Sequence, residues 1–143
     1  LYNTLEANGR AVLPISFLPG KPDINSDAQP MIDRVVKILK QHPELGLIIE
    51  GHTDNAGDAS DNQRLSSERA RAVRARLIAG GIERKRLTSA GKGGSHPLAD
   101  NTTAEGRAQN RRIELVVRED SALLHPAAPN GTNYYPAPGA RNP

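Results

Sequence analysis

The sequence contains no cysteine and very few aromatic residues. Its 143 residues include one Phe, three Tyr and no Trp. The absence of cysteine excludes disulfide bonds, zinc–thiolate sites and thiol catalysis. It leaves the cellular compartment open, because both reducing and oxidising compartments hold cysteine-free domains. With 36% hydrophobic and 3% aromatic residues, any core must be modest in size and aliphatic.

Long apolar segments are also missing. The sequence has no run of about 18 apolar residues that could cross a bilayer as a helix, and no basic, apolar leader of the secretory type at its N-terminus. It begins at Leu1 rather than at a methionine. We therefore expect a piece of a longer precursor, whose targeting signal or anchor lies elsewhere. The length suits one domain with one core.

Recognisable catalytic motifs are absent as well. Neither a Gly-x-Ser-x-Gly nucleophile motif nor a phosphate-binding loop occurs. His52 has no second histidine at a metal-ligand spacing, because His42, His96 and His125 are isolated in predicted loops or in the C-terminal tail. We interpret His52 as structural and expect neither an enzyme nor a cofactor. A cell-wall hydrolase would need a metal or a nucleophile that the sequence does not offer.

The charge of the chain is unevenly distributed. Residues 1–61 carry five Lys and Arg against nine Asp and Glu, a net charge of −4, whereas residues 62–118 carry 13 against five, a net charge of +8. A solvated, arginine-rich helix face explains such a run in most proteins. The alternative is attraction to an anionic polymer, either nucleic acid or a cell-wall polymer.

Hydrophobic periodicity predicts alternating strands and helices. Ile32, Val35, Val36 and Leu39 follow the i, i+3, i+4, i+7 pattern of an amphipathic helix. The continuous apolar run around 45–49 is typical of a strand buried on both faces. The expected elements are a strand over 11–17, a helix from about 26 to 42, a strand over 45–50, a helix capped by Asn62 or Ser66 and ending at Gly80-Gly81, a strand over 87–91, a helical turn over 103–110 capped by Thr103, and a strand over 113–117.

This order predicts an α/β two-layer sandwich of the βαβαββ type, with a mixed sheet packed on helices. We assign the folded domain to residues 5–120. Residues 121–143 are rich in Pro, Ala and Asn. That composition is typical of a disordered tail, because it offers little apolar surface to bury.

Two charged residues stand at predicted element ends. Asp54 follows the second strand, at the edge where α/β sheets tend to bind ligands, although Asp in such places often only shapes a loop. Arg69 is expected in the first turns of the following helix, where an uncompensated cation is slightly unfavourable and a bound carboxylate would reverse the effect. The alternative for Arg69 is an internal ion pair with Glu50, Asp54 or Asp58. Together, Asp54 and Arg69 would match a ligand that carries both an ammonium and a carboxylate.

The residues around Asp54 and Arg69 form part of a longer pattern. Its members are Gly51-His52-Thr53-Asp54, Gly57, Asn62, Leu65-Ser66, Arg69-Ala70, Val73, Gly80-Gly81-Ile82, Arg86-Leu87, Gly91, Pro97, Asn101-Thr102-Thr103, Glu105-Gly106-Arg107-Ala108 and Asn110-Arg111-Arg112-Ile113-Glu114. With this pattern, the sequence resembles the OmpA-like peptidoglycan-binding domain over roughly residues 11–118.

The resemblance implies a non-catalytic domain of the OmpA, Pal and MotB type. It implies binding of peptidoglycan through the meso-diaminopimelate of the stem peptide, with Asp54 receiving the ammonium and Arg69 the carboxylate. Thr53 and Asn62 would be polar helpers, and Leu65 and Ile113 would supply apolar contact. It further implies a periplasmic location within an outer-membrane or otherwise envelope-anchored protein. We expect no nucleic-acid partner, because the sequence has few aromatic residues for base stacking and no recognition-helix motif. A porin, a lipoprotein, a flagellar stator and a secretion component all stay open as the parent protein.

Two features of the pattern call for separate expectations. Where the family's first strand commonly ends in polar residues, this sequence has Phe17-Leu18-Pro19-Gly20. Either backbone groups of Gly20 replace a polar side-chain contact, or that contact is missing and the affinity for the ligand is reduced. The arginines at 107, 111 and 112 are either struts that tie the last helix and strand together or a second group of ligand contacts, Arg112 among them. We favour struts.

Overall fold

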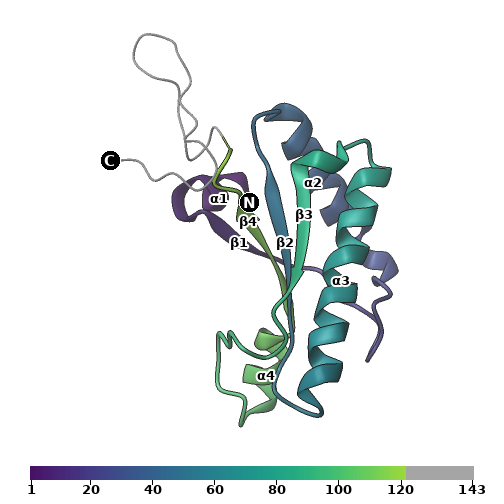
Figure 1. Ribbon diagram of the computed structural model, residues 1–143, viewed down its shortest axis with the longest axis vertical. Coiled ribbons are helices and arrows are strands. Elements are labelled where there is room, and N and C mark those ends of the chain that lie inside the picture. The colour runs from purple at the N-terminus through teal and green to yellow at the C-terminus, as the bar shows by residue number, and fades with distance from the viewer. Residues whose placement is uncertain (122–143) are drawn as a thin grey trace.

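The computed structural model describes residues 1–121 of the chain. It is a mixed four-stranded sheet whose one face is covered by two long helices (Figure 1). The elements are α1 (Tyr2–Asn8), β1 (Arg10–Leu13), α2 (Gln29–Gln41), β2 (Leu47–His52), α3 (Ala59–Ala79), β3 (Leu87–Gly91), α4 (Ala104–Asn110) and β4 (Arg112–Val117), with short 3-10 helices at Ser26–Ala28 and Arg84–Arg86.

The strand order of the sheet is β1-β4-β2-β3. β2 and β3 are parallel, whereas β4 is inserted between β1 and β2 and runs antiparallel to both. As a result, the end of β2 lies beside the start of β4, where His52 pairs with Arg112. The loop after β2 and the residues before β4 therefore meet at one end of the sheet.

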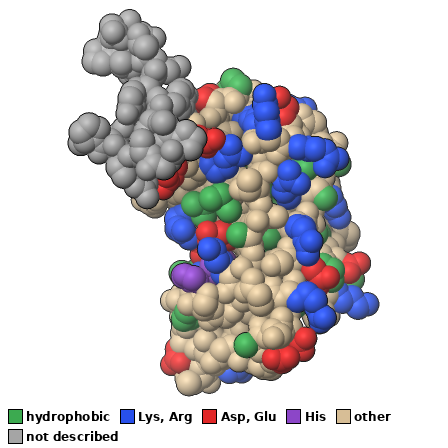
Figure 2. Space-filling model, in the orientation of Figure 1, with side chains coloured by type: hydrophobic (Ala, Val, Ile, Leu, Met, Phe, Trp, Pro, Cys, Tyr) green, Lys and Arg blue, Asp and Glu red, His purple; other side chains and the backbone are tan. Residues whose placement is uncertain are grey.

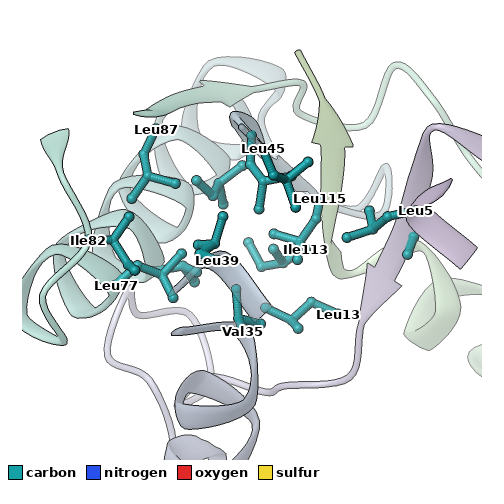
Figure 3. Packing of buried hydrophobic residues seen from close by; sticks show 14 of the residues in the cluster. Leu5, Leu13, Val35, Leu39, Leu45, Leu77, Ile82, Leu87, Ile113 and Leu115 are labelled. Atoms are coloured by element: carbon teal, nitrogen blue, oxygen red, sulfur yellow. The ribbon is translucent and has the colours of Figure 1, made fainter. Parts of the chain in front are cut away.

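The core lies between the helices and one face of the sheet (Figure 3). It is aliphatic, as the composition predicts, because alternate residues of the strands point toward α2 and α3. Leu115 in the central strand β4 packs there with Leu39 of α2 and Leu77 of α3. Leu5 of α1 joins the same cluster, and α1 packs against β1 and β4.

Two glycines allow α3 to lie unusually close to the sheet. A Cβ atom on Gly51 would overlap with the backbone carbonyl of Ser66, and one on Gly91 would overlap with the side chain and backbone of Ser67. Ser66 is fully buried at this contact, and its hydroxyl accepts a hydrogen bond from the backbone N–H of Gly93 at 2.9 Å. The glycines in the Gly-His-Thr-Asp segment and in β3 are therefore packing requirements.

The opposite face of the sheet carries buried charges. Glu50 and His52 of β2 and Glu114 and Arg112 of β4 are all buried, and the pairing of Glu50 with Glu114 places the two carboxylates side by side. Arg10 of β1 donates to Glu114 at 2.7 Å and to Glu50 at 3.4 Å. Ion pairs therefore stabilise this face of the sheet, whereas aliphatic contacts stabilise the face covered by α2 and α3.

Most of the predicted elements are confirmed: the two-layer architecture, the helix ending near Gln41, the strand Leu87–Gly91 and the last strand. The predicted cap of the last helix is also confirmed, because Thr103 accepts a hydrogen bond from the N–H of Gly106. The prediction had no element before residue 11, so α1 was missed. Its seven residues hold only one buried hydrophobic residue, Leu5, and this leaves no periodic pattern to detect.

Two predicted boundaries were wrong. The first strand ends at Leu13, before Pro14, and Phe17 instead forms an isolated antiparallel bridge with Ile24. The second long helix begins at Ala59 with Asp58 as its cap, which accepts from the N–H of Ser60. The two predicted caps, Asn62 and Ser66, therefore lie inside the helix.

The end of the described chain is packed. Ser121, which the prediction placed first in the tail, is buried, and its hydroxyl bonds to both the N–H and the carbonyl of Gly46. The rest of the predicted tail, from residue 122, lies outside the described residues. Among residues 1–121, no helix is long and apolar enough to cross a membrane.

We predict that Gly51→Ala destabilises the fold, because the added methyl group would meet the backbone of Ser66 in a packed contact. Overpacking of this kind typically costs about 1–3 kcal/mol. Urea unfolding of both proteins would measure the change. Gly46→Ala is the matched control, because its added methyl group would meet only the flexible end of Arg118. Equal stabilities of the two variants would contradict the prediction.

Candidate ligand-binding site

Asp54 lies just beyond the C-terminal end of β2, at the end of the sheet where α4 leads into β4 (Figure 1). The residue is only 8% exposed. Its Oδ1 accepts a hydrogen bond from the N–H of Ala56 at 2.9 Å, a turn that Asp commonly stabilises. Its Oδ2 takes part in an ion pair with the guanidinium of Arg111 at 2.6 Å. The carboxylate thus shapes its loop and also faces a cation.

Arg69 is a buried cation without an acidic partner among residues 1–121. It is 8% exposed and forms no ion pair with a described carboxylate, so the predicted alternative of a pair with Glu50, Asp54 or Asp58 was wrong. Its Nε donates to the carbonyl of Lys21 at 2.9 Å. A second nitrogen, Nη2, lies 3.4 Å from the carbonyl of Leu18.

The guanidinium of Arg69 keeps unused donors. It stacks over the ring of Phe17, 4.8 Å from the centroid, and Nη1 makes no hydrogen bond to the described residues. Nη1 is not enclosed, since His52 Nδ1 is the one enclosed side-chain polar atom without a partner in this part of the chain. A guanidinium with free donors at an accessible position can receive a carboxylate.

Burial lowers the pKa of Arg69, and the positive charge of Arg111 lowers it further. Both effects make an additional cation unfavourable here and an anion favourable. The expectation of an anion at Arg69 came from placing this residue near the positive end of the helix dipole, and that placement was wrong. Because α3 begins at Ala59, Arg69 lies about three turns into the helix, where the dipole of the helix terminus has little effect.

The loop over residues 17–21 contributes backbone groups that hold Arg69, and the replacement of a ligand contact by Gly20 stays a prediction. The carbonyls of Leu18 and Lys21 hold Arg69. Gly20 has a φ of 68°, which lets the chain turn between them.

The structure gives the predicted polar helpers a supporting role. The hydroxyl of Thr53 donates to the carbonyl of Asp54 at 2.8 Å. The amide of Asn62 donates to the carbonyl of Ala56 at 2.8 Å and lies 3.4 Å from that of Asp54. Both side chains therefore hold the loop that carries Asp54. Leu65 is half-buried on α3.

Two of the predicted supporting residues are not available to a ligand. Ile113 is 1% exposed and packs in the core, because residues 113, 115 and 117 of β4 point toward the helices. Arg112 points to the other face, where its Nε bonds to Glu114 and its remaining nitrogens donate to the carbonyls of Asn110 and His96. Arg112 is thus one of the struts that the sequence favoured.

The neighbouring arginine behaves differently. Arg111 reaches Asp54 instead of an internal carbonyl. Sequence reasoning grouped it with the struts and missed it as a site residue. The available signal was its place directly before a strand, since consecutive side chains at a strand start diverge to opposite sides.

Glu50, His52 and Glu114 are the described residues that could in principle hold a metal, because their ligand atoms lie within 4.8 Å of one another. The carboxylates are already engaged, however. Arg10 bonds to both of them and Arg112 to Glu114, so two guanidinium groups balance two carboxylates. We interpret the group as an ion-pair network.

His52 is the least satisfied member of this network. Its Nε2 lies 3.1 Å from Oε1 of Glu50, and its Nδ1 is enclosed without a partner. Burial lowers the pKa of His52, and the charge of Arg112 lowers it further, against the opposing effect of Glu50. Burial alone would raise the pKa of Glu114, but hydrogen bonds from Arg112 and Arg10 hold it below its usual value.

Comparison with known proteins shows the family of the chain. The model of the OmpA family matches residues 16–111. The chain belongs to the OmpA family. Outer membrane porin F of Pseudomonas aeruginosa is 39% identical over 127 residues, which cover 82% of this chain and 36% of that protein. The peptidoglycan-binding protein ArfA of Mycobacterium bovis is 41% identical over 87 residues, covering 61% of this chain and 27% of that protein.

The fold is likewise that of a solved family member. The peptidoglycan-associated lipoprotein from Burkholderia pseudomallei superimposes with a TM-score of 0.66 at 28% identity, covering 78% of this chain and 92% of that one. The chain spans about a third or less of the length of the two curated relatives. The similarity therefore concerns one domain of those proteins.

We predict that acidification destabilises the fold through His52. Because the folded-state pKa of His52 is lowered, the unfolded chain binds more protons as the pH falls below about 6.5, and stability falls with it. The lowered pKa of Glu114 acts only at more acidic pH, since its contribution persists until the pH falls through the folded-state value. Urea unfolding at pH 7 and pH 5 would measure the loss.

His52→Gln should flatten this dependence between pH 7 and pH 5. The control variant His42→Gln should keep it, because the ring of His42 stacks on Tyr2 and not on His52. If both variants lost stability on acidification to the same extent as the wild type, His52 would not be the titrating group.

Proposed function

We propose that this domain binds peptidoglycan without catalysis and holds the protein that contains it to the cell wall. It recognises the meso-diaminopimelate of the stem peptide. The observation that carries the proposal is Arg69, a buried guanidinium with no carboxylate partner among residues 1–121. It is linked to Asp54 through Arg111, which pairs with Asp54 and whose charge acts on Arg69. Family membership supports it, since relatives include proteins named for peptidoglycan binding and association.

The ligand chemistry matches the two charges. The distal end of diaminopimelate carries an ammonium and a carboxylate on one carbon. Asp54 would accept hydrogen bonds from the ammonium, and the free donors of Arg69 would pair with the carboxylate. A lysine-type stem has the ammonium alone and leaves Arg69 unpaired, which the low exposure of Arg69 makes unfavourable. Recognition of both charges needs only a fixed cleft, consistent with a binding module.

The location follows from the ligand. Peptidoglycan lies outside the inner membrane, so we place the domain in the periplasm, within an outer-membrane or otherwise envelope-anchored protein. The names of relatives are consistent with this, among them an outer membrane porin and a cell wall anchor of the type VI secretion system. Which role the parent protein has, whether porin, lipoprotein, stator or secretion component, stays open.

The net charge of +8 on residues 62–118 is weak support for a nucleic-acid partner. Lys and Arg side chains are spread along the side of the molecule where α3 lies, and acidic side chains stand among them (Figure 2). Several of these arginines are engaged internally, for example Arg74 with the carbonyl of Leu87 and Arg86 with those of Leu39 and His42. Solvated and structural arginines account for the charge, and the domain is expected to have no nucleic-acid partner.

Calorimetric titration with a diaminopimelate-containing muropeptide, beside a lysine-containing one, tests the proposal. We expect selective binding of the first, weakened strongly by Asp54→Asn or Arg69→Gln, because loss of one partner of a buried charge pair typically costs about 2–5 kcal/mol. Asp61→Asn and Arg71→Gln are matched controls, since these exposed residues of α3 undergo the same charge changes. A folded wild-type domain that binds neither muropeptide would refute the proposal.

Amidation of the distal carboxylate offers a second test. An amide cannot pair with Arg69 as a carboxylate does, and hydrogen bonds to charged groups contribute about 1.5–3 kcal/mol. We therefore expect the amidated muropeptide to bind roughly tenfold more weakly or worse. The same titration with both ligands measures the difference, and equal affinities would show that Arg69 does not recognise the carboxylate.

A further inference from the structure

Arg111 is the least constrained of the charged side chains around the site. Arg69 is held by two carbonyls and the ring of Phe17, and all three guanidinium nitrogens of Arg112 are engaged. Arg111, by contrast, makes one side-chain hydrogen bond within the described chain, to Asp54, and its side chain is 47% exposed. It can therefore leave Asp54 by rotating into solvent without breaking any other side-chain hydrogen bond to the described residues.

In the free domain, Arg111 occupies the place of a ligand cation. Oδ1 of Asp54 is used by the backbone of Ala56, and Oδ2 receives the guanidinium of Arg111. An ammonium that binds Asp54 must share this oxygen or displace Arg111. A carboxylate that is only 8% exposed has little room for two cations.

The charges of the site do not balance. Asp54 contributes one negative charge, while Arg69 and Arg111 each contribute a positive one. The two guanidinium groups interact across the site, because the charge of Arg111 lowers the pKa of Arg69. Adding a lone ammonium makes the surplus of positive charge larger. Adding an ammonium together with a carboxylate leaves it unchanged.

We propose that Arg111 is an exchangeable internal counter-ion that makes the site respond only to a ligand with both charges. The ligand ammonium replaces Arg111 at Asp54, and the released guanidinium turns to the ligand carboxylate beside Arg69. This inference rests on the proposed function and adds a specificity-determining residue to it.

Arg111 in this role acts mainly against the wrong ligand. When a lysine-type stem displaces Arg111 from Asp54, it leaves two guanidinium groups without an anion, so its binding is opposed. A diaminopimelate-type stem supplies the missing anion and meets no such opposition. Arg69 alone would make the correct ligand bind more tightly, whereas Arg111 makes the wrong ligand bind more weakly.

The test compares Arg111→Gln with the wild type, using lysine-type and diaminopimelate-type muropeptides followed by NMR chemical-shift titration, which also measures weak binding. We expect the affinity for the lysine type to rise about tenfold, while that for the diaminopimelate type changes by less than about threefold. Arg111→Lys, which keeps the charge, should restore discrimination. Arg64→Gln is the control for loss of one positive charge, on an exposed side chain of α3.

The outcomes separate this inference from the proposed function. If the wild type does not bind the diaminopimelate type, the proposed function fails. If it binds selectively but Arg111→Gln leaves the affinity for the lysine type unchanged, only the role of Arg111 fails. A parallel fall of both affinities would show Arg111 to be an ordinary ligand contact and would also overturn the inference. Thermal unfolding checks that each variant is folded.

Discussion

The close approach of α3 to β2 and β3 is the constraint on which the rest of the structure depends. It exists because Gly51 and Gly91 present bare backbone to Ser66 and Ser67. Arg69 follows Ser66 by about one helical turn, so the contact that packs the helix also sets the position of Arg69 relative to the end of β2. The end of β2 sets the position of Asp54, and α3 sets that of Arg69. A looser contact would let the two charges drift apart.

Two adjacent arginines at the start of β4 point to different sides and have different partners. Arg112 turns to the face of the sheet that lacks long helices and joins Glu114, Glu50 and Arg10, whereas Arg111 points to Asp54. The ion-pair network thereby secures the strand ends directly beneath the site. Buried ion pairs add little net stability compared with apolar packing. Their effect here is geometric, since they fix the register of β2 against β4 at the residues next to Asp54 and Arg111.

The sequence predicts those features whose signal is local. The amphipathic period of α2, the apolar run of β2 and the Thr103 cap were sufficient to place these elements, and the motif spacing drew attention to Asp54 and Arg69. It could not show that α3 starts at Ala59, because an Asp-rich segment suits both a loop and a first helical turn. Nor could it show that Arg111 rather than Arg112 faces Asp54. That depends on the pairing of strands distant in the sequence, since Arg111 and Asp54 are 57 positions apart.

The arrangement of the sheet has a mechanical consequence. The site lies at the end of the sheet where β2 finishes and β4 begins, and α1 and the close of β4 lie at the opposite end (Figure 1). A pull between a wall-bound ligand and the polypeptide on either side of the domain would run along the strands. The hydrogen bonds between β1, β4 and β2 would then be loaded together in shear instead of one after another. The resistance of the sheet to such a pull would then depend on its rate of unfolding rather than on its thermodynamic stability.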